Sequence, residues 1–351
     1  MGLTKELDAI LEEAIRHADP GCVVSVIRDG TTIYEKAVGY RQMVPVKLPL
    51  AVDTIFDIAS LTKIVTTTMI LQLMSEGKFH LHTSLDRLLS EPNPILQAHF
   101  ADITIYQLMT HSSGLLNWHP FYTENLDFFE QMAKFEARFF CGKKVRYSDL
   151  NFILLGKVIE ETTGESIKEA FHRLIKTPLK LKSMAYGPVE PDNVATTEFG
   201  NQIEMKMCRE RGRTFANWRN REVPICGEVN DGNTHYFFDG ISGHAGLFAT
   251  AEDVCKIGRI YTDAAIADQV GIDRSFIQAA GTKLIDNRAL GFEFTPVFPD
   301  GFGHTGFTGT SMFVRPSQKT VAVLLTNRLH QDGPANLDTL RKTVHETVCR
   351  Y

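Results

Sequence analysis

The chain has 351 residues and a formal net charge of -5, with 43% hydrophobic and 23% charged residues. This length and composition indicate a globular protein of one large or two smaller domains with a substantial core. The negative charge argues against bulk attraction to nucleic acid or an anionic membrane, and no apolar run is long enough to span a bilayer. We therefore expect neither a nucleic-acid partner nor a membrane span.

The N-terminal residues predict an amphipathic helix through His17 and lack the apolar core of a signal peptide. The six cysteines are scattered without a C-x-x-C pair, which is typical of reduced, buried thiols. We expect a cytoplasmic protein; an exported form whose signal has been removed is the alternative. The cysteines are Cys22, Cys141, Cys208, Cys226, Cys255 and Cys349.

Each end of the chain predicts a β-hairpin next to a helix. The first hairpin turns at Asp29-Gly30, and the second turns at Pro316-Ser317-Gln318 before a final helix from about residue 334 to 349. We expect one antiparallel sheet assembled from both ends and covered by the terminal helices. The predicted strands are 22–27, 32–38, 311–314 and 320–325.

The middle of the chain predicts mainly helices, one of them over 149–161, followed by long loops over 188–233. The predicted fold class is therefore α+β. An α/β lobe with an antiparallel sheet flanked by helices is formed by residues 1–55 and 240–351. A mostly helical lobe, 56–239, is inserted into it, and we expect the active site at the junction.

Five arginines lie between Arg209 and Arg221, in a stretch that also contains Trp218. A solvated face is the favoured interpretation of this basic stretch. A contact for an anionic substrate or partner is the alternative.

A long apolar run with helical periodicity begins near Ser60 and ends at Gly77. Ser60 and Lys63 stand three residues apart at its N-terminal end, on one helix face. The positive end of the helix dipole favours a developing alkoxide, and a neutral lysine can take the hydroxyl proton. The pair therefore indicates a serine nucleophile with a lysine base.

The S-x-x-K tetrapeptide is a weak signal by itself, because Ser75-Glu76-Gly77-Lys78 also fits it. This second match lies at the C-terminal end of the same run, where the dipole is negative and Gly77 ends the helix. Taken alone, Ser60 would be an ordinary serine at a helix start. The interpretation therefore depends on the rest of the chain.

Two further segments supply groups that such a nucleophile needs. Tyr147 precedes the helix at 149–161 and is a candidate proton donor for the leaving group. Residues 303–311 contain three glycines with hydroxyl side chains between them, directly before a strand, so that a ligand can approach the backbone. A dinucleotide loop is rejected here, because that fingerprint follows a strand and opens a helix.

In this order the segments resemble the serine β-lactamase and penicillin-binding-protein superfamily, specifically its class C-like branch. Tyr-Ser-Asp at 147–149 stands where the branch usually has Tyr-x-Asn, and His-Thr-Gly at 304–306 stands where β-lactamases have Lys-Thr-Gly. The resemblance extends from residue 22 to residue 327 and implies a β-lactamase/transpeptidase-like fold. Similar stretches also occur at 54–59, 108–115, 154–156 and 242–248.

The resemblance implies a role for each matching residue. Ser60 attacks the carbonyl carbon, Lys63 activates the serine, and Tyr147 relays protons to the leaving group. The oxyanion rests on the backbone N–H groups of Ser60 and Phe307. No cofactor is implied.

The resemblance also implies that His304 and Thr305 hold the substrate carboxylate or its equivalent. We count His304 among the catalytic residues and Thr305 among the substrate-binding residues. Asp149 replaces an amide by a group that normally only accepts, so we do not expect a direct copy of the amide's contact to Lys63 or to a substrate amide. A free histidine loses its charge near ~6.5. We therefore expect carboxylate substrates to bind less well to a His304 site as the pH rises through neutrality.

The leading hypothesis is a serine hydrolase that acts on an ester or a D-amino-acid-containing amide through an acyl-enzyme. It would resemble D-Ala-D-Ala carboxypeptidases and D-peptidases, or carboxylesterases, and its substrate would be a small molecule or peptide. A true class C-like β-lactamase is one alternative. A non-catalytic protein that binds penicillin or cell-wall fragments is the alternative from another class.

We predict no metal site. His80 and His82 alternate along a short predicted strand, and no Cys, Asp or Glu cluster accompanies them. His111 and His244 belong to the family-like glycine segments, and a structural role is expected for both.

Overall fold

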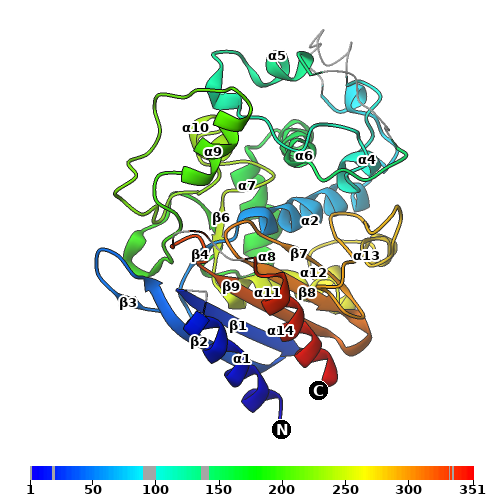
Figure 1. Cartoon of the computed structure of the whole chain (residues 1–351). Helices are drawn as coiled ribbons and strands as arrows, with labels where there is room; N and C mark the ends of the chain where they lie inside the picture. The colour runs from blue at the N-terminus through cyan, green and yellow to red at the C-terminus, as the bar shows by residue number, and fades with distance from the viewer. Residues whose placement is uncertain (1, 18–19, 90–99, 136–141, 332, 334–335) are drawn as a thin grey trace.

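A six-stranded antiparallel sheet joins the two ends of the chain (Figure 1). In the computed structural model, which describes residues 2–17, 20–89, 100–135, 142–331, 333 and 336–351, the strand order is β3-β2-β1-β9-β8-β7. The central pair sets Val24 of β1 opposite Leu324 of β9. The predicted sheet built from both ends is therefore confirmed. Its strands are β1 (Gly21–Arg28), β2 (Thr31–Gln42), β3 (Leu48–Pro49), β7 (Phe302–Thr305), β8 (Ser311–Arg315) and β9 (Thr320–Thr326).

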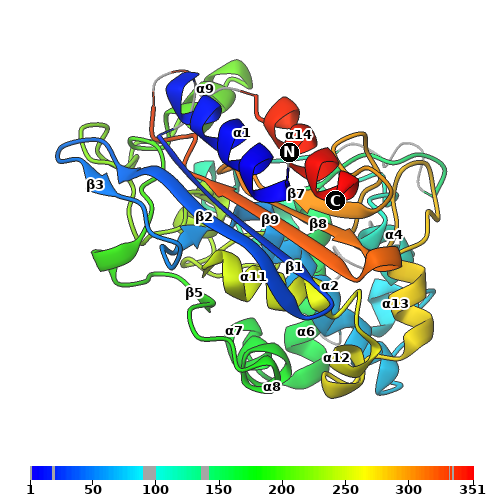
Figure 2. The ribbon, with the colours of Figure 1, turned by 90° about the horizontal axis from the view of Figure 1, so that it is seen from below.

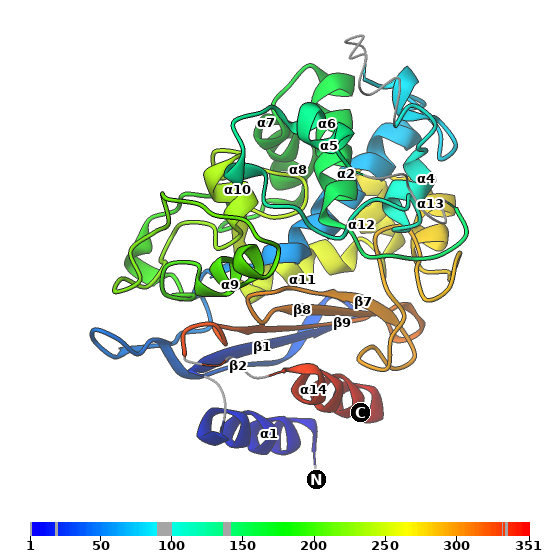
Figure 3. The same cartoon turned by 45° about the horizontal axis from the view of Figure 1, so that its top comes forward.

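The two terminal helices, α1 (Leu3–His17) and α14 (Asp338–Arg350), lie together on one face of this sheet (Figures 2 and 3). Their apolar sides pack on the strands in one buried cluster that includes Leu7, Val24 and Val348. The other face carries α11 (Ala251–Arg259) and, beyond it, the helical part of the molecule. Because both faces are covered, all of β9 is buried, and it reads as a continuous apolar run flanked by threonines.

Helix α2 (Thr62–Ser75) runs through the centre of the helical part, and all but its last residue are buried. Its apolar side chains are spread around the helix and not gathered on one face, and such a helix has to be enclosed on every side. It packs against α6 (Asp149–Thr163) and α7 (Ile167–Phe171). The N-terminal end of this central helix faces the sheet, and it is there that Ser60 lies.

A second sheet has three strands in the order β4-β6-β5 and lies next to the start of α2. Strand β4 (Phe56–Asp57) leads directly into the short 3₁₀ helix η1 (Ala59–Leu61) and then into α2. The small sheet also contains β5 (Ala185–Tyr186) and β6 (Leu247–Ala249). It therefore ties the start of α2 to two distant parts of the chain.

The remaining elements are short and connect these layers. They are η2 (Leu85–Arg87), α4 (Ile105–Met109), η3 (Phe121–Thr123), α5 (Phe128–Ala133), the π-helical turn η4 (His172–Lys176), α8 (Thr177–Leu179), η5 (Pro191–Asn193), α9 (Gln202–Glu210), α10 (Gly232–Tyr236), α12 (Ala264–Gln269), α13 (Arg274–Ala280) and η6 (Pro316–Gln318). None of the helices in the described part of the chain has the length and hydropathy needed to cross a bilayer.

Three sequence-based expectations about local structure differ from the structure. The predicted long loop over 188–233 contains α9, which buries Met205 and Cys208 on one side. The Gly, Asn and Arg residues around this short helix led to the prediction of a loop. His80 and His82 do not lie on a strand but in a turn after α2. The last helix begins only at Asp338, whereas we predicted a start near residue 334, which lies outside the described residues. Cys141, one of the predicted reduced thiols, also lies outside them.

The division into two lobes at residues 55 and 240 remains a prediction. Strand β6, from the segment assigned to the α/β lobe, pairs with β4 and β5 from the segment assigned to the helical lobe. Helix α11, from the same segment, packs on β1, β8 and β9. The segment after residue 240 therefore contacts both parts of the molecule.

Candidate active site

Ser60 lies where a strained turn passes from β4 into α2. The preceding residue, Ala59, has a φ of +46°, in the left-handed region that a residue with a Cβ rarely adopts. The buried carboxylate of Asp57 holds this turn, because its Oδ1 accepts the Ala59 N–H at 2.8 Å and its Oδ2 accepts the Asn230 N–H at 2.7 Å. Burial raises the pKa of Asp57 to about 6 despite these hydrogen bonds.

The loop between β7 and β8 fastens the same turn from the sheet side. The hydroxyls of Thr308 and Thr310 donate to the carbonyl oxygens of Asp57 and Ile58 at 2.7 and 3.0 Å. Gly306 lies so close that a Cβ on it would stand 2.7 Å from the Ile58 oxygen. The glycine is therefore required for the close approach of the His-Thr-Gly segment to the serine.

Lys63 is fully buried and its ammonium group has three acceptors. The Nζ atom lies 2.8 Å from Ser60 Oγ, 2.8 Å from Asp149 Oδ1 and 3.1 Å from the His244 carbonyl oxygen. An ammonium carries three N–H donors, so all of them are used. Burial acts to lower the pKa of Lys63, but the ion pair with Asp149 and the contacts with Tyr147 outweigh it, and the pKa is raised. The expectation of a neutral lysine is therefore wrong for the free protein.

Asp149 occupies the first position of α6, where a carboxylate also suits the helix dipole. Asp149 contacts Lys63 as an ion pair, so the contact of an amide at this position is not copied directly. Its side chain is 18% exposed, so the pair lies at the edge of a cavity, where a substrate could reach it.

Tyr147 donates a hydrogen bond from its hydroxyl to Ser60 Oγ at 3.0 Å. Burial raises the pKa of the phenol, the cationic Lys63 lowers it, and the net shift is upward. The phenol thus keeps its proton at neutral pH and can donate it. His111 packs against the tyrosine ring at 4.6 Å and accepts the Ser148 N–H through Nδ1, which holds the segment before α6 in place.

His304 is buried, and its Nδ1 lies 2.7 Å from the Thr305 carbonyl oxygen. A carbonyl only accepts, so the proton of a neutral ring must reside on Nδ1, and Nε2 presents a lone pair. Burial, and then the charges of Lys63 and Arg288, hold the pKa of His304 well below its ordinary value. Because the pKa is lowered, we do not expect His304 to change its charge near neutrality, contrary to the prediction from the sequence. A neutral ring whose Nε2 accepts also cannot anchor a carboxylate.

Arg288 is a cavity residue that the sequence analysis missed. Its guanidinium carbon lies 5.4 Å from the centre of the Tyr147 ring, and its Nη2 forms an ion pair with Glu293 at 3.0 Å. Within the described structure its buried Nε and Nη1 have no hydrogen-bond partner. No motif surrounds Arg288 in the sequence, and only the folded chain brings it to Tyr147.

Two arginines orient the loop that carries Phe307. Arg341 donates to the Gly306 carbonyl at 3.0 Å, and Arg328 donates to the Phe307 carbonyl at 2.7 Å. In a trans peptide the C=O and N–H point in opposite directions, so the Phe307 N–H points away from Arg341. This is the amide that the sequence predicted for the oxyanion. Phe307 itself is 42% exposed.

These residues share one cavity of about 470 Å³. All of the predicted site residues except the fully enclosed Lys63 line it, and Lys63 contacts Ser60 directly. Trp118 also lines it. The other lining residues include Asn117, Glu204, Met207, Asn230, Asp231, His244, Ala245, Arg288, Glu293, Thr308, Arg328 and Arg341.

The remaining sequence candidates lie elsewhere or have other partners. Ser75 donates to the Leu71 carbonyl and accepts the Asp273 N–H, at the far end of α2. Arg219, in the basic stretch, is not on a solvated face: it is mostly buried, donates to the Val229 carbonyl and pairs with Glu228. Among the described residues, no three His, Cys, Asp or Glu side chains are grouped as a metal would require.

Comparison with known proteins assigns residues 7–345 to the Beta-lactamase family model. The N-acetylmuramyl-L-alanine amidase of Bacillus subtilis is 28% identical over 93% of this chain and 81% of its own length. A putative D-alanyl-D-alanine carboxypeptidase of Escherichia coli O157:H7 is also 28% identical, over 93% and 82%.

Solved structures share the fold. EstCE1, described as a hydrolase with promiscuous acyltransferase activity, superposes with a TM-score of 0.73 at 22% identity, over 98% of each chain. A class C β-lactamase from Rhodobacter sphaeroides gives 0.73 at 18% identity, over 99% of each chain. These similarities confirm the predicted fold class.

Proposed function

Because the chain belongs to the Beta-lactamase family, a family of serine hydrolases, we propose that it cleaves an ester or a D-amino-acid-containing amide through an acyl-enzyme on Ser60. One observation carries this proposal: Ser60 Oγ receives hydrogen bonds from both Lys63 and Tyr147 at the floor of a cavity. A protein that only bound its ligand would have no need to bring these three groups into contact.

The first step of the proposed reaction is a proton transfer, because Lys63 is a cation in the free protein. Lys63 gives one proton to Asp149, which lies 2.8 Å away, and becomes a neutral amine. The amine then removes the proton of Ser60 as Oγ forms its bond to the substrate carbonyl carbon. The negative charge that develops on the carbonyl oxygen is held by the N–H groups of Ser60 and Phe307.

The second step breaks the bond to the leaving group. Tyr147 donates its proton to the departing nitrogen or oxygen and is reprotonated from Lys63, which now holds the serine proton. The products are the acyl-Ser60 ester and a protonated leaving group. A water molecule then attacks the ester, and its proton returns to Ser60 Oγ through the same two side chains as the acid departs.

The leaving group lies beside Arg288, because Arg288 packs on Tyr147, the group that protonates it. Arg288 lines the cavity, and a guanidinium suits a carboxylate on that leaving group. This arrangement favours a carboxypeptidase-like substrate, with a free carboxylate after the scissile amide, over a neutral ester. The two curated relatives named above, an amidase and a putative carboxypeptidase, support an amide substrate.

A test combines labelling with three substrates. Mass spectrometry after exposure to a fluorophosphonate or penicillin should find an adduct on Ser60, and no adduct would favour a binding protein. Turnover is then compared for a peptide ending in D-Ala-D-Ala, a penicillin and p-nitrophenyl acetate. We expect the peptide to give the highest kcat/KM. A highest value for penicillin would identify a β-lactamase, and a highest value for the ester a carboxylesterase.

A further inference from the structure

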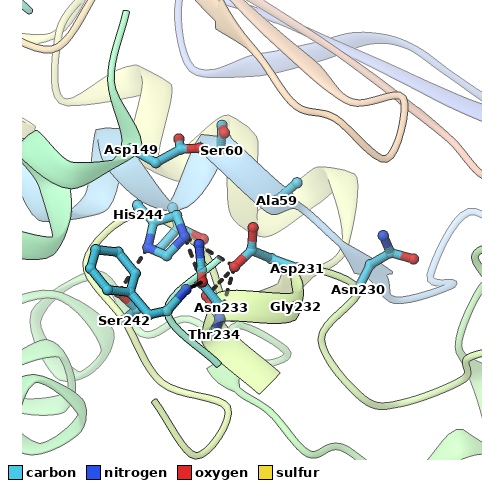
Figure 4. A network of polar contacts seen from close by, with 12 residues as sticks. Ala59, Ser60, Asp149, Asn230, Asp231, Gly232, Asn233, Thr234, Ser242 and His244 are labelled. Carbon is cyan, nitrogen blue, oxygen red and sulfur yellow. Dashed lines mark hydrogen bonds and ion pairs between the residues drawn. The ribbon is translucent and has the colours of Figure 1, made fainter. Parts of the chain in front are cut away.

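A second group of cavity residues gathers around the carboxylate of Asp231. Its Oδ1 accepts three hydrogen bonds, from Thr234 N at 2.8 Å, Thr234 Oγ1 at 2.8 Å and His244 Nε2 at 3.0 Å. Figure 4 shows that the other oxygen is turned away from these donors, to the side on which Ala59 and Ser60 lie. Asp231 and Ser60 line the same cavity, so this second oxygen is available to a bound substrate.

The carboxylate of Asp231 is ionised. Burial opposes its charge, but the contacts from His244 and Thr234 outweigh burial and hold the pKa at about 2. In the described part of the chain its ion-pair partner is His244, on the oxygen that is already occupied. The free oxygen therefore presents a negative charge to the cavity, and such a charge favours a cationic partner.

The two neighbours of Asp231 leave it as the acceptor that faces Ser60. The Asn230 side chain gives its N–H₂ to Glu198 and points away from Asp231 and Ser60 in Figure 4. Trp118 also lines the cavity, and the Arg211 guanidinium already lies 5.1 Å from the centre of its ring, so the indole is compatible with a cation beside it.

Glu204 lies in the same part of the cavity but is not free to bind. Its Oε1 accepts the Gly232 N–H at 2.6 Å and its Oε2 accepts the Tyr122 hydroxyl at 2.7 Å. Burial, and then the charge of Asp231, raise its pKa to about 8. At neutral pH it carries little charge, and Asp231 is the charged acceptor of this group.

Under the proposed function, the leaving group lies with Arg288 and Tyr147, so the acyl part of the substrate occupies the remaining part of the cavity, around Asp231. We propose that Asp231 binds a primary ammonium group carried by the acyl part of the substrate. This inference rests on the proposed function for the orientation of the substrate. The ammonium could be the α-amino group of an N-terminal residue or the end of a lysine-like side chain.

Binding is measured in the Ser60→Ala protein at about pH 6.5, where an α-amino group is protonated. The three probes are D-alanine p-nitroanilide, its neutral analogue propionic p-nitroanilide, and N-acetyl-D-lysine p-nitroanilide. We expect calorimetry to show that one of the two cationic probes binds about 10- to 100-fold more tightly than the neutral one, as a charged hydrogen bond predicts. Which of them is preferred identifies the source of the ammonium. Equal affinity for all three probes would overturn the inference.

The matched variants are Asp231→Asn and Glu204→Gln, each made in the Ser60→Ala background. Asp231→Asn removes the charge and should reduce the preference for the cationic probe to about twofold or less. Glu204→Gln removes a carboxyl whose two oxygens are already bonded, and it should keep the preference. A preference that survives in Asp231→Asn would contradict the inference. If Asp231→Asn does not fold, the comparison of the three probes on the Ser60→Ala protein still tests the inference.

Failure of the proposed function gives a different result from failure of this inference. Wild-type protein that forms no adduct on Ser60 and cleaves none of the three substrates of the first test, yet binds the cationic probe preferentially, would refute the hydrolase and support the ammonium site. Wild-type protein that hydrolyses the propionic and D-alanine anilides equally well would support the hydrolase and refute the ammonium site.

Discussion

The S-x-x-K pattern occurs at both ends of the α2 segment, and the two serines differ in their hydrogen-bond partners and in their access to the cavity. Ser60 begins the segment and receives hydrogen bonds from Lys63 and Tyr147 inside a cavity. Ser75 ends the helix and bonds to the backbone carbonyl of Leu71, one turn earlier, before Gly77 turns the chain with a φ of +73°. The comparison teaches that the neighbours of the tetrapeptide, brought from other parts of the chain, create its chemistry.

The largest expected effect separates the two serines. Ser60→Ala removes the nucleophile and should lower kcat by several orders of magnitude with any ester or amide substrate. Ser75→Ala removes a hydroxyl that bonds to its own helix, and activity should stay within about twofold because nothing in the cavity changes. Steady-state kinetics of both purified variants checks the contrast. If Ser75→Ala were the inactive one, our assignment of the nucleophile would be wrong.

Tyr147 is a neighbour that Ser60 has and Ser75 lacks. Tyr147→Phe keeps the ring against His111 and Arg288 but removes the proton donor, so acylation should slow by about 10²- to 10⁴-fold. The free energy of unfolding should change by about 1 kcal/mol or less. Single-turnover kinetics and urea unfolding measure the two quantities. A variant that loses stability but acylates at the normal rate would show that the tyrosine serves packing alone.

Asp149 sets the charge of Lys63, so Asp149→Asn should move the pH profile. Burial lowers the pKa of a lysine and the carboxylate raises it. Without the carboxylate the pKa of Lys63 falls, but the internal acceptor of its proton is lost as well, so the neutral amine can form only by release of a proton to solvent. We expect kcat/KM of Asp149→Asn to be about tenfold or more below wild type at neutral pH and to rise with pH as Lys63 loses its proton. A variant that matches wild type at every pH would mean that Asp149 does not take the Lys63 proton.

The smallest expected effect is the pH dependence of carboxylate binding. Burial holds the pKa of His304 well below its ordinary value, so we expect the ring to carry no charge in the neutral range. Arginine side chains in general are charged throughout that range. The KM of a substrate with a free carboxylate should therefore vary by less than about twofold between pH 6 and pH 8.

Two substitutions sharpen this last prediction. Arg288→Gln should raise the KM of the carboxylate substrate about tenfold or more, and by a larger factor than the KM of p-nitrophenyl acetate. A KM that rises with pH through neutrality and becomes flat in His304→Lys would restore the histidine as the anchor.

The sequence predicted those parts of the molecule that depend on local pattern. Local patterns in the sequence predicted the hairpins and the buried central helix. The order of the motifs with Ser60, Tyr147 and His304 led to the family resemblance, and the family match confirms it. The short helix α9 was missed because it lies inside a long stretch rich in Gly, Asn and Arg, although its own apolar residues gather on one side.

The errors at the site have a different origin. The charge of Lys63 depends on Asp149, and the tautomer of His304 depends on one backbone carbonyl. Arg288 reaches Tyr147 only through the tertiary fold, from a segment without a motif. Protonation states and distant partners are properties of the assembled cavity, and residue spacing does not encode them.

The carboxylate of Asp57 links two functions that the cavity otherwise keeps apart. One of its oxygens fixes the backbone that carries the nucleophile, and the other fixes Asn230, the residue before Asp231. The backbone before Ser60 and the backbone before the proposed acyl subsite thus share one hydrogen-bond acceptor. We therefore expect that a ligand that displaced the Asp231 segment would also disturb the position of Ser60, so that recognition of the acyl group would affect reactivity toward it.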